Sequence, residues 1–138
     1  ALSSAASDVY KRQAIMKLGN DIIEIDRIRQ AIEKSSSFKA RVYTIHEIEY
    51  CKSRNKGCYE SFAGIYAAKE AFIKALGTGM RHGSWQDIEI YHDEWGAPLI
   101  RLQDAFKDIY ETSGYTDIHV SISHCKDYAM STVILEGA

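Results

Sequence analysis

The stretch FAGIYAAKEAFIKALGTG, residues 62–79, decides the fold because it predicts one long helix that is closed by glycine. Apolar residues at helical spacing form one broad face, and small residues fill most of the remaining circumference, so the helix has no clear solvent side. We expect this helix to span about residues 59–76. Two charges, Lys69 and Glu70, lie in the middle of a segment that otherwise suits burial.

The segments on either side of this helix complete an α+β pattern. Residues 17–25 are rich in β-branched side chains and predict a first strand. Asp26 fits the N-cap of the helix that follows, and Thr44 with Glu47 fits a capping box before the next helix. Later segments predict a strand at 85–93, its partner at 99–102, a helix at 104–114, and two strands within 117–137. The order β-α-α-α-β-β-α-β-β favours an α+β fold in which a mainly antiparallel sheet packs on one long central helix.

The composition indicates a single globular domain. Of the 138 residues, 46% are hydrophobic and 26% are charged, which suffices to bury roughly two-thirds of the unfolded surface in one core. No repeat, low-complexity segment or linker indicates a second domain. Residues 1–15 are small, polar and without period, so we treat them as a tail, either disordered or introduced by cloning, and assign residues 16–138 to the single domain.

Charge and cysteine content exclude several function classes. The formal net charge is -2, whereas a general nucleic-acid binder needs a broad surface of Lys and Arg. Cys51, Cys58 and Cys125 are odd in number and lack zinc-like spacing, which favours a reducing cytoplasm. No run reaches the roughly 18 apolar residues that cross a bilayer, and nothing resembles a signal peptide. We therefore expect a cytoplasmic protein that binds neither nucleic acid nor membrane.

Glu70 and Lys74 lie one turn apart on the long helix, and the pattern supports two interpretations equally. A solvated ion pair at this spacing would contribute only a few tenths of a kcal/mol. Alternatively, Glu70 ligates a metal ion while Lys69 and Lys74 reach toward an anion, because lone charges are costly to bury.

Asp21 raises the same question in the first predicted strand. Strand alternation places it with Ile23 and Ile25 on the face that is expected to meet the core. It serves either as a turn or cap residue at the start of the strand, or as a second oxygen ligand beside Glu70. Mg²⁺ usually takes one or two carboxylates and completes its shell with water and substrate phosphates.

The glycines of GTGMRHG, among them Gly77 and Gly79, do not form a Walker phosphate loop. They follow the helix, so the nearby end of the helix dipole is negative and repels anions. A phosphate at this place must be held by side-chain cations or by a metal ion.

The segment HVSISH, residues 119–124, contains two serines followed by a histidine. No Gly-x-Ser-x-Gly elbow surrounds Ser121 or Ser123, so a hydrolase that uses either serine with His124 is only weakly supported. A structural role for these residues at a strand end is the alternative.

Several segments match one protein family when they are taken together. They are GNDIIEIDRI at 19–28, RVYTIHEIEYC at 41–51, FAGIYAAKEAFIKALGTG at 62–79, WQDIEI at 85–90 with GAPLI at 96–100, and HVSISHCKDYAMSTVILE at 119–136. They occur in the family's order and cover nearly everything from Lys17 onward. The set resembles the holo-[acyl-carrier-protein] synthases, which are small 4′-phosphopantetheinyl transferases.

This resemblance implies an activity and a metal site. The family transfers the 4′-phosphopantetheine arm of coenzyme A to a serine of apo acyl carrier protein, in support of fatty acid biosynthesis, and releases adenosine 3′,5′-bisphosphate. Asp21 and Glu70 match the family's two Mg²⁺ carboxylates. Lys69 and Lys74 fall where the family contacts coenzyme A phosphates, and His124 matches a histidine beside the nucleotide.

The resemblance also implies partners. Gly77, Gly79 and Arg41 are included in the expected coenzyme A site, and Arg27 matches a position that meets the acidic carrier protein. The family forms homotrimers whose active sites lie between subunits, so a neighbouring chain is expected to supply some ligands.

Two positions depart from the family's pattern. Ile65 stands where the family commonly has Arg, which puts one cationic contact to coenzyme A in doubt. The change either weakens coenzyme A binding or shifts the contact to Lys69 and Arg41. Lys17 replaces the first glycine of the usual GIGxD opening, and we infer nothing from this change.

The reaction needs a base that takes the serine proton, and the sequence leaves three candidates open. They are a water held by the metal, which we favour, a carboxylate of the site, and His124. Because of Ile65, the alternative function is a non-catalytic module that binds coenzyme A or carrier protein.

Overall fold

The computed structural model describes residues 15–137. Its helices and strands are β1 (Ile15–Glu24), α2 (Ile25–Lys34), α3 (Ser36–Val42), α4 (Ile45–Ser53), α5 (Cys58–Leu76), β2 (Ile88–His92), β3 (Pro98–Leu102), α6 (Asp104–Thr112), β4 (Tyr115–His124) and β5 (Tyr128–Gly137). Short 3₁₀ turns at Asn55–Gly57, Met80–His82 and Trp85–Asp87 connect some of them. The predicted α+β fold is confirmed.

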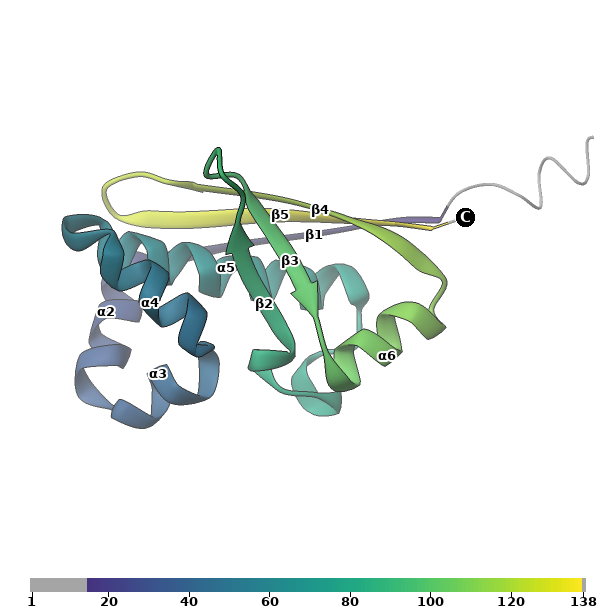
Figure 1. The fold of residues 1–138 in the computed structure, drawn as a ribbon, viewed down its shortest axis with the longest axis horizontal. Coiled ribbons are helices and arrows are strands. Elements are labelled where there is room, and N and C mark those ends of the chain that lie inside the picture. Colours follow the sequence, from purple (N-terminus) through teal and green to yellow (C-terminus); the bar gives the residue numbers. More distant parts are fainter. Residues whose placement is uncertain (1–14, 138) are drawn as a thin grey trace, which may run out of the picture.

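The strands form two antiparallel sheets that lie against the long helix. The larger sheet has three strands in the order β1-β5-β4, and β2 pairs with β3 in a separate hairpin. Figure 1 shows α5 running along one face of the larger sheet, with α2, α3 and α4 gathered at one end and α6 at the other. The predicted long helix and its closure by Gly77, which has a φ of 82°, are confirmed.

Local differences from the expected elements have physical causes. Asp26 is not an N-cap, because the amide of Ile25 donates to the carbonyl of Asp127 and helix α2 starts directly at the end of β1. The capping box of Thr44 and Glu47 is confirmed. Helix α3 was not expected, because its seven residues are too few for a clear amphipathic period.

The predicted terminal tail falls mostly outside the described residues. The part at 1–14 is not described, whereas Ile15 belongs to β1 and pairs with Gly137. The boundary of the tail at residue 15 was therefore wrong. None of the helices within residues 15–137 has both the length and the apolar content that a membrane-spanning helix needs.

Strand β1 approaches α5 more closely than a side chain would allow. A Cβ atom on Gly19 would overlap the carbonyl oxygen of Ala71 and lie 2.5 Å from the amide nitrogen of Ala75. Both alanines are buried. This contact explains why one side of the long helix carries only small residues, and it sets the distance between the first strand and Glu70.

Lys69 is a structural residue of the core, not a ligand of an anion. Its ammonium group is fully buried and donates to the carbonyl of Val42 at 2.8 Å, to Oε1 of Glu47 at 2.7 Å and to the carbonyl of Trp85 at 3.1 Å. These contacts use all three donors of a lysine. The prediction that Lys69 reaches a phosphate of coenzyme A was therefore wrong, because its charge is already paired inside the protein.

Glu47 completes this buried polar cluster. Its second oxygen accepts from the amide of Ile90 at 2.8 Å, so the ion pair also joins α4 to β2. Burial raises the pKa of Glu47 and lowers that of Lys69, while their mutual attraction opposes both shifts. Removing either partner would leave a buried charge without compensation.

We predict that Gly19→Ala destabilises the fold, because the added methyl group must push β1 away from α5. Overpacking of this kind costs about 1–3 kcal/mol, and contact with rigid backbone places the change at the upper end. Urea denaturation followed by circular dichroism would measure the loss. Gly57→Ala is the matched control, since its added Cβ would meet only the Cβ of Arg54 at 3.9 Å. Equal unfolding midpoints for the two variants would contradict the close approach.

Candidate active site

Asp21 and Glu70 come together where β1 crosses α5. Asp21 lies on the face of β1 that turns toward the helix, as strand alternation predicted, and its side chain is only 14% exposed. It pairs across the sheet with Ser131, in the interior of the strand, so a cap role at the start of the strand is excluded. Burial raises the pKa of Glu70, and the negative charge of Asp21 raises it further. The two carboxylates are therefore close enough to repel each other.

Lys74 is the cation at this carboxylate pair. Its ammonium nitrogen lies 3.0 Å from Oδ1 of Asp21 and 3.1 Å from the carbonyl oxygen of Asn20. The ion pair of Lys74 is therefore with β1, and no ion pair with Glu70 forms in the described structure. The side chain of Lys74 is 54% exposed, so its third donor is open to a ligand.

Tyr66 holds Glu70 in place, and sequence reasoning missed it. The Tyr66 hydroxyl donates to Oε1 of Glu70 at 3.2 Å, and its ring stacks on Trp85 with the ring centroids 5.4 Å apart. Burial and the charge of Glu70 raise the pKa of Tyr66 to about 12, so the hydroxyl keeps its proton at neutral pH. The spacing of four residues between Tyr66 and Glu70 was a usable signal, because residues four apart are neighbours on a helix surface.

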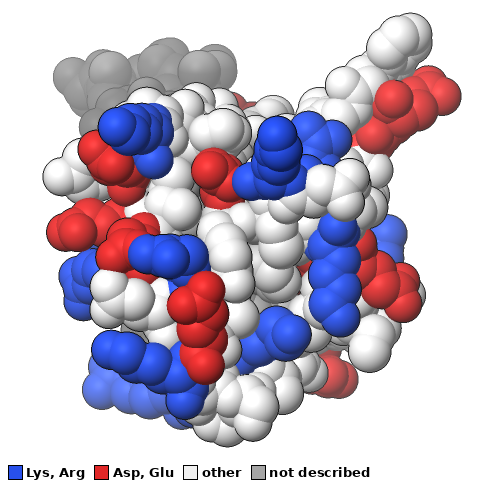
Figure 2. Space-filling model, turned by 90° about the vertical axis from the view of Figure 1, so that its left-hand side faces the viewer, with Lys and Arg blue, Asp and Glu red and all other residues white. Residues whose placement is uncertain are grey.

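Two further predicted residues, Arg27 and Arg41, lie on the same side of the molecule as Tyr66. The positive charge of Arg27 acts on Tyr66 and lowers its pKa, against the larger effect of burial. The guanidinium of Arg41 lies over the ring of Phe38, 5.9 Å from its centroid, and Phe38 in turn packs beside Tyr66. Figure 2 shows that basic and acidic side chains alternate over the end of the molecule formed by α2–α4, without a continuous basic surface.

Gly77 and Gly79 follow the C-terminal end of α5, close in sequence to Lys74. Both have positive φ, 82° and 70°, in the region that favours glycine. A Cβ atom at either position would meet nothing within 4 Å, so the backbone here borders open space. A ligand can therefore approach this backbone closely.

His124 lies at the other edge of the sheet. It ends β4, and β5 separates β4 from β1, so about two strand spacings, roughly 10 Å, separate the strands that carry His124 and Asp21. His124 therefore does not join the carboxylates within one chain. It lines a pocket of about 210 Å³ on the β4 side of α5. Other residues of this pocket are Tyr50, Arg54, Ile65, His92 and Ile122.

The serines beside His124 do not form a hydrolase site. Ser121 and Ser123 point to the face of β4 opposite the one that carries Ile122 and His124, because side chains alternate along a strand. Within residues 15–137 no hydrogen bond joins either serine side chain to His124. The hydrolase hypothesis is therefore not supported, because it requires a hydrogen bond between one of these serines and His124.

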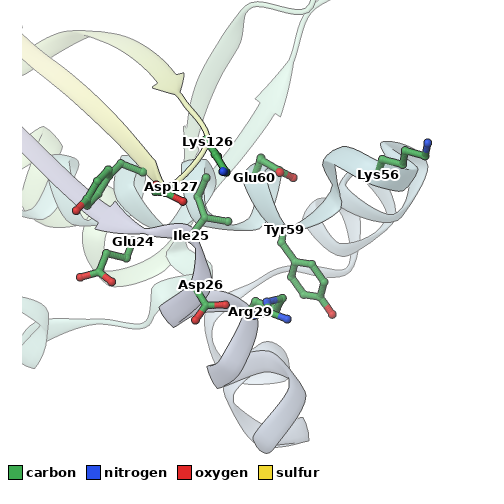
Figure 3. A pocket seen from close by; sticks show the side chains of 10 residues that line it. Glu24, Ile25, Asp26, Arg29, Lys56, Tyr59, Glu60, Lys126 and Asp127 are labelled. Atoms are coloured by element: carbon green, nitrogen blue, oxygen red, sulfur yellow. Dashed lines mark hydrogen bonds and ion pairs between the residues drawn. The ribbon is translucent and has the colours of Figure 1, made fainter.

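Another cavity of the described structure belongs to neither half of the predicted site. It has a volume of about 490 Å³ and lies between the start of α2, the start of α5 and the β4–β5 turn. Figure 3 shows Glu60 of α5 and Lys126 of the turn on one side of it, and Asp26 and Arg29 of α2 on another. Asp26 and Arg29 form an ion pair. Acidic and basic groups are thus mixed here, which gives the cavity no clear preference for an ion.

The donor set of Asp21 and Glu70 fits a magnesium ion that shares its shell with substrate. Within the described part of the chain, no three His, Cys, Asp or Glu side chains gather into a complete metal cage. Mg²⁺ is commonly held by one or two carboxylates together with water and phosphate oxygens, and Asp21 and Glu70 supply that number. The residues present therefore fit this ion.

A comparison with protein families accounts for this arrangement. The family model described as "4'-phosphopantetheinyl transferase superfamily" matches residues 17–133. The chain belongs to this superfamily. The predicted resemblance is thereby confirmed over nearly the whole described chain.

Individual members of the superfamily agree with this assignment. The chain is 46% identical over 122 residues to a holo-[acyl-carrier-protein] synthase of Ruminiclostridium cellulolyticum, a match that covers 87% of this chain and 91% of that protein. The Helicobacter pylori synthase in complex with coenzyme A has a TM-score of 0.75 and 32% identity, over 86% of this chain and 98% of that one. A Bacillus anthracis synthase in complex with "CoA (3',5'-ADP)" has a TM-score of 0.73 and 35% identity, over 91% and 100%.

We predict that Glu70→Gln stabilises the protein at neutral pH when divalent cations are absent. The folded-state pKa of Glu70 is raised, so its favourable contribution is complete below its unfolded pKa and is lost as the pH rises through the folded value. The gain should be on the order of 0.5 kcal/mol, because water screens a partly exposed group.

Urea unfolding of both proteins at pH 4 and pH 8 would measure this effect. The variant should gain stability relative to the original chain at pH 8 and not at pH 4. Glu111→Gln, at an exposed site on α6, controls for the loss of one surface charge. A gain of the same size at both pH values would argue against repulsion between the two carboxylates.

Proposed function

We propose that this protein is a Mg²⁺-dependent holo-[acyl-carrier-protein] synthase. It transfers 4′-phosphopantetheine from coenzyme A to a serine of apo acyl carrier protein and releases adenosine 3′,5′-bisphosphate, a cytoplasmic reaction that supports fatty acid biosynthesis. The observation that carries the proposal is the pair Asp21 and Glu70, with Lys74 beside it, in a chain that aligns with named synthases over most of its length.

The reaction is a displacement at phosphorus, so alignment and neutralisation of charge are the main tasks. The serine oxygen forms a bond to the β-phosphorus of coenzyme A, the bond between that phosphorus and the departing bisphosphate breaks, and a water molecule at the site takes the serine proton. Asp21 and Glu70 would hold a Mg²⁺ ion, which would supply positive charge to offset that of the pyrophosphate. Lys74 would place a second positive charge beside the phosphates. Tyr66 fixes the orientation of the Glu70 carboxylate through its hydroxyl.

The active site is completed by a second copy of the chain, in a homotrimer. Two features support this part of the proposal. The carboxylates and the pocket of His124 lie at opposite edges of the larger sheet, so one ligand meets both only across a subunit boundary. The sheet face that turns away from α5 also exposes an apolar surface, which is typical of an interface. Its residues are Met16, Leu18, Ile22, Tyr128 and Met130.

The carrier protein docks beside the carboxylates through Arg27. Arg27 is exposed on the first turn of α2, and its charge reaches Tyr66, which binds Glu70. An acidic partner bound at this place would bring its serine toward the metal site. The position of Arg27 thus supports a contact with the acidic carrier protein, in which charge mainly assists association.

Intact-mass analysis of an apo acyl carrier protein tests the proposed function. Incubation with the enzyme, coenzyme A and Mg²⁺ should add about 340 Da, the mass of the phosphopantetheine arm, because a covalent bond forms to the serine. Asp21→Asn and Glu70→Gln should each reduce the rate at least about a hundredfold, since both remove charge from the metal site. Glu111→Gln is the matched control and should leave the rate unchanged.

The same experiment distinguishes the alternative of a binding module. The buried apolar side chain of Ile65, where the family commonly has Arg, is the observation that favours this alternative. Binding of coenzyme A without any gain in the mass of the carrier protein would contradict the transferase and support the module.

A further inference from the structure

The pocket on the β4 side of α5 combines basic side chains with an apolar wall. Arg54, His92 and His124 contribute the basic groups, and Ile65 and Ile122 contribute apolar surface. Its volume of about 210 Å³ is too small for a whole dinucleotide-sized cofactor but large enough for a phosphate with part of a sugar or base. Ile65 is only 1% exposed and carries no charge, so it offers no cation to such a ligand.

Arg54 is held at the edge of this pocket by two elements. It caps the C-terminal end of α4, where its backbone amide donates to the carbonyls of Cys51 and Lys52. Its guanidinium carbon lies 5.9 Å from the centroid of the Tyr50 ring. The Tyr50 ring in turn stacks on His92 of β2, with centroids 3.9 Å apart and planes inclined by 10°. The aromatic pair therefore gives the arginine a rigid support.

The guanidinium of Arg54 is available to a ligand. Among residues 15–137, no carboxylate oxygen lies within 4.0 Å of it, and its side chain is exposed. Glu60 is the one carboxylate among the described residues that line the pocket. It also borders the larger cavity on the other side, beside Lys126 (Figure 3).

The charge of Arg54 acts on its neighbour His92 in the pocket. Burial lowers the pKa of His92, and the positive charge of Arg54 lowers it further, so His92 is mainly neutral near pH 7. A neutral imidazole still donates one hydrogen bond. A permanent cation beside a neutral donor is the arrangement that suits a phosphate group.

We propose that Arg54 supplies the cationic contact to a phosphate of the nucleotide part of coenzyme A in this pocket, where Ile65 provides none. The inference rests on the proposed function, because it takes coenzyme A as the ligand. Within the assembled enzyme, this pocket of one chain would face the carboxylate pair of its neighbour. Arg54 is then a specificity residue for the phosphorylated nucleotide, positioned by Tyr50 and His92.

A purely structural role is the competing explanation for Arg54. A positive side chain at the C-terminal end of α4 interacts favourably with the helix dipole, and the ring of Tyr50 covers part of its stem. Such a role would make Arg54→Ala lower the melting temperature without changing affinity for one ligand over another. Ligand binding therefore separates the two explanations.

Isothermal titration of the full chain with adenosine 3′,5′-bisphosphate and with adenosine tests the proposal. Arg54→Ala should weaken binding of the bisphosphate at least about tenfold, because a charge-assisted hydrogen bond is lost, and leave binding of adenosine unchanged. The affinity of Arg54→Lys for the bisphosphate should lie between the affinities of the original chain and of Arg54→Ala, since lysine keeps the charge and loses the planar fork. Lys52→Ala, an exposed lysine two residues away that does not line the pocket, is the matched control.

A rescue experiment adds a second readout. Introducing Ile65→Arg into Arg54→Ala should restore affinity for the bisphosphate, with circular dichroism confirming that the double variant is folded. In the transfer assay, Arg54→Ala should raise KM for coenzyme A about tenfold while kcat changes little, because the contact is remote from the reacting phosphorus.

The outcomes separate this inference from the proposed function. If the original chain modifies the carrier protein and Arg54→Ala binds the bisphosphate equally well, the role of Arg54 is overturned and the transferase stands. If the original chain binds no bisphosphate and transfers nothing, both are overturned. Equal weakening of bisphosphate and adenosine would also overturn the inference, because it would indicate a general distortion of the pocket.

Discussion

The close contact between β1 and α5 at Gly19 is the constraint on which the rest of the structure depends. A strand can lie this near to a helix only where the strand has no side chain and the helix offers small residues such as Ala71. Two residues further along the strand, Asp21 is thereby brought against the helix surface that carries Glu70. The repulsion of the two carboxylates is thus imposed by backbone packing. The proposed cation between them would relieve this repulsion.

Packing also brings the buried charges of Lys69 and Glu47 together, but these two charges attract each other. Here the charges neutralise each other, and the remaining donors and acceptors are used by main-chain groups, so the cluster joins α3, α4, α5 and β2. Neighbouring residues on one helix, Lys69 and Glu70, therefore have separate tasks. Their side chains leave the helix about 100° apart, which places one in the core and the other at the site.

Periodicity and capping patterns were sufficient to predict most of the fold. The long helix, its glycine closure and the parity of Asp21 in β1 all follow from short-range rules, and these predictions are confirmed. The role of Lys69 was not predictable, because its partner Glu47 lies on another helix and already had a local role in the capping box. The pocket of Arg54 was not predictable for a similar reason. It is formed by α4, α5, β2, β3 and β4, and no single segment carries its pattern.

Because Trp85 stacks on Tyr66, its fluorescence can report on changes at the carboxylate site. The indole of Trp85 stacks on the ring of Tyr66, whose hydroxyl binds Glu70. The second tryptophan, Trp95, is 86% exposed at the tip of the β2–β3 hairpin. Aqueous quenchers should extinguish the emission of Trp95 first and leave a signal dominated by the partly buried indole. Occupancy of the carboxylate site can then be followed by fluorescence in the unlabelled protein.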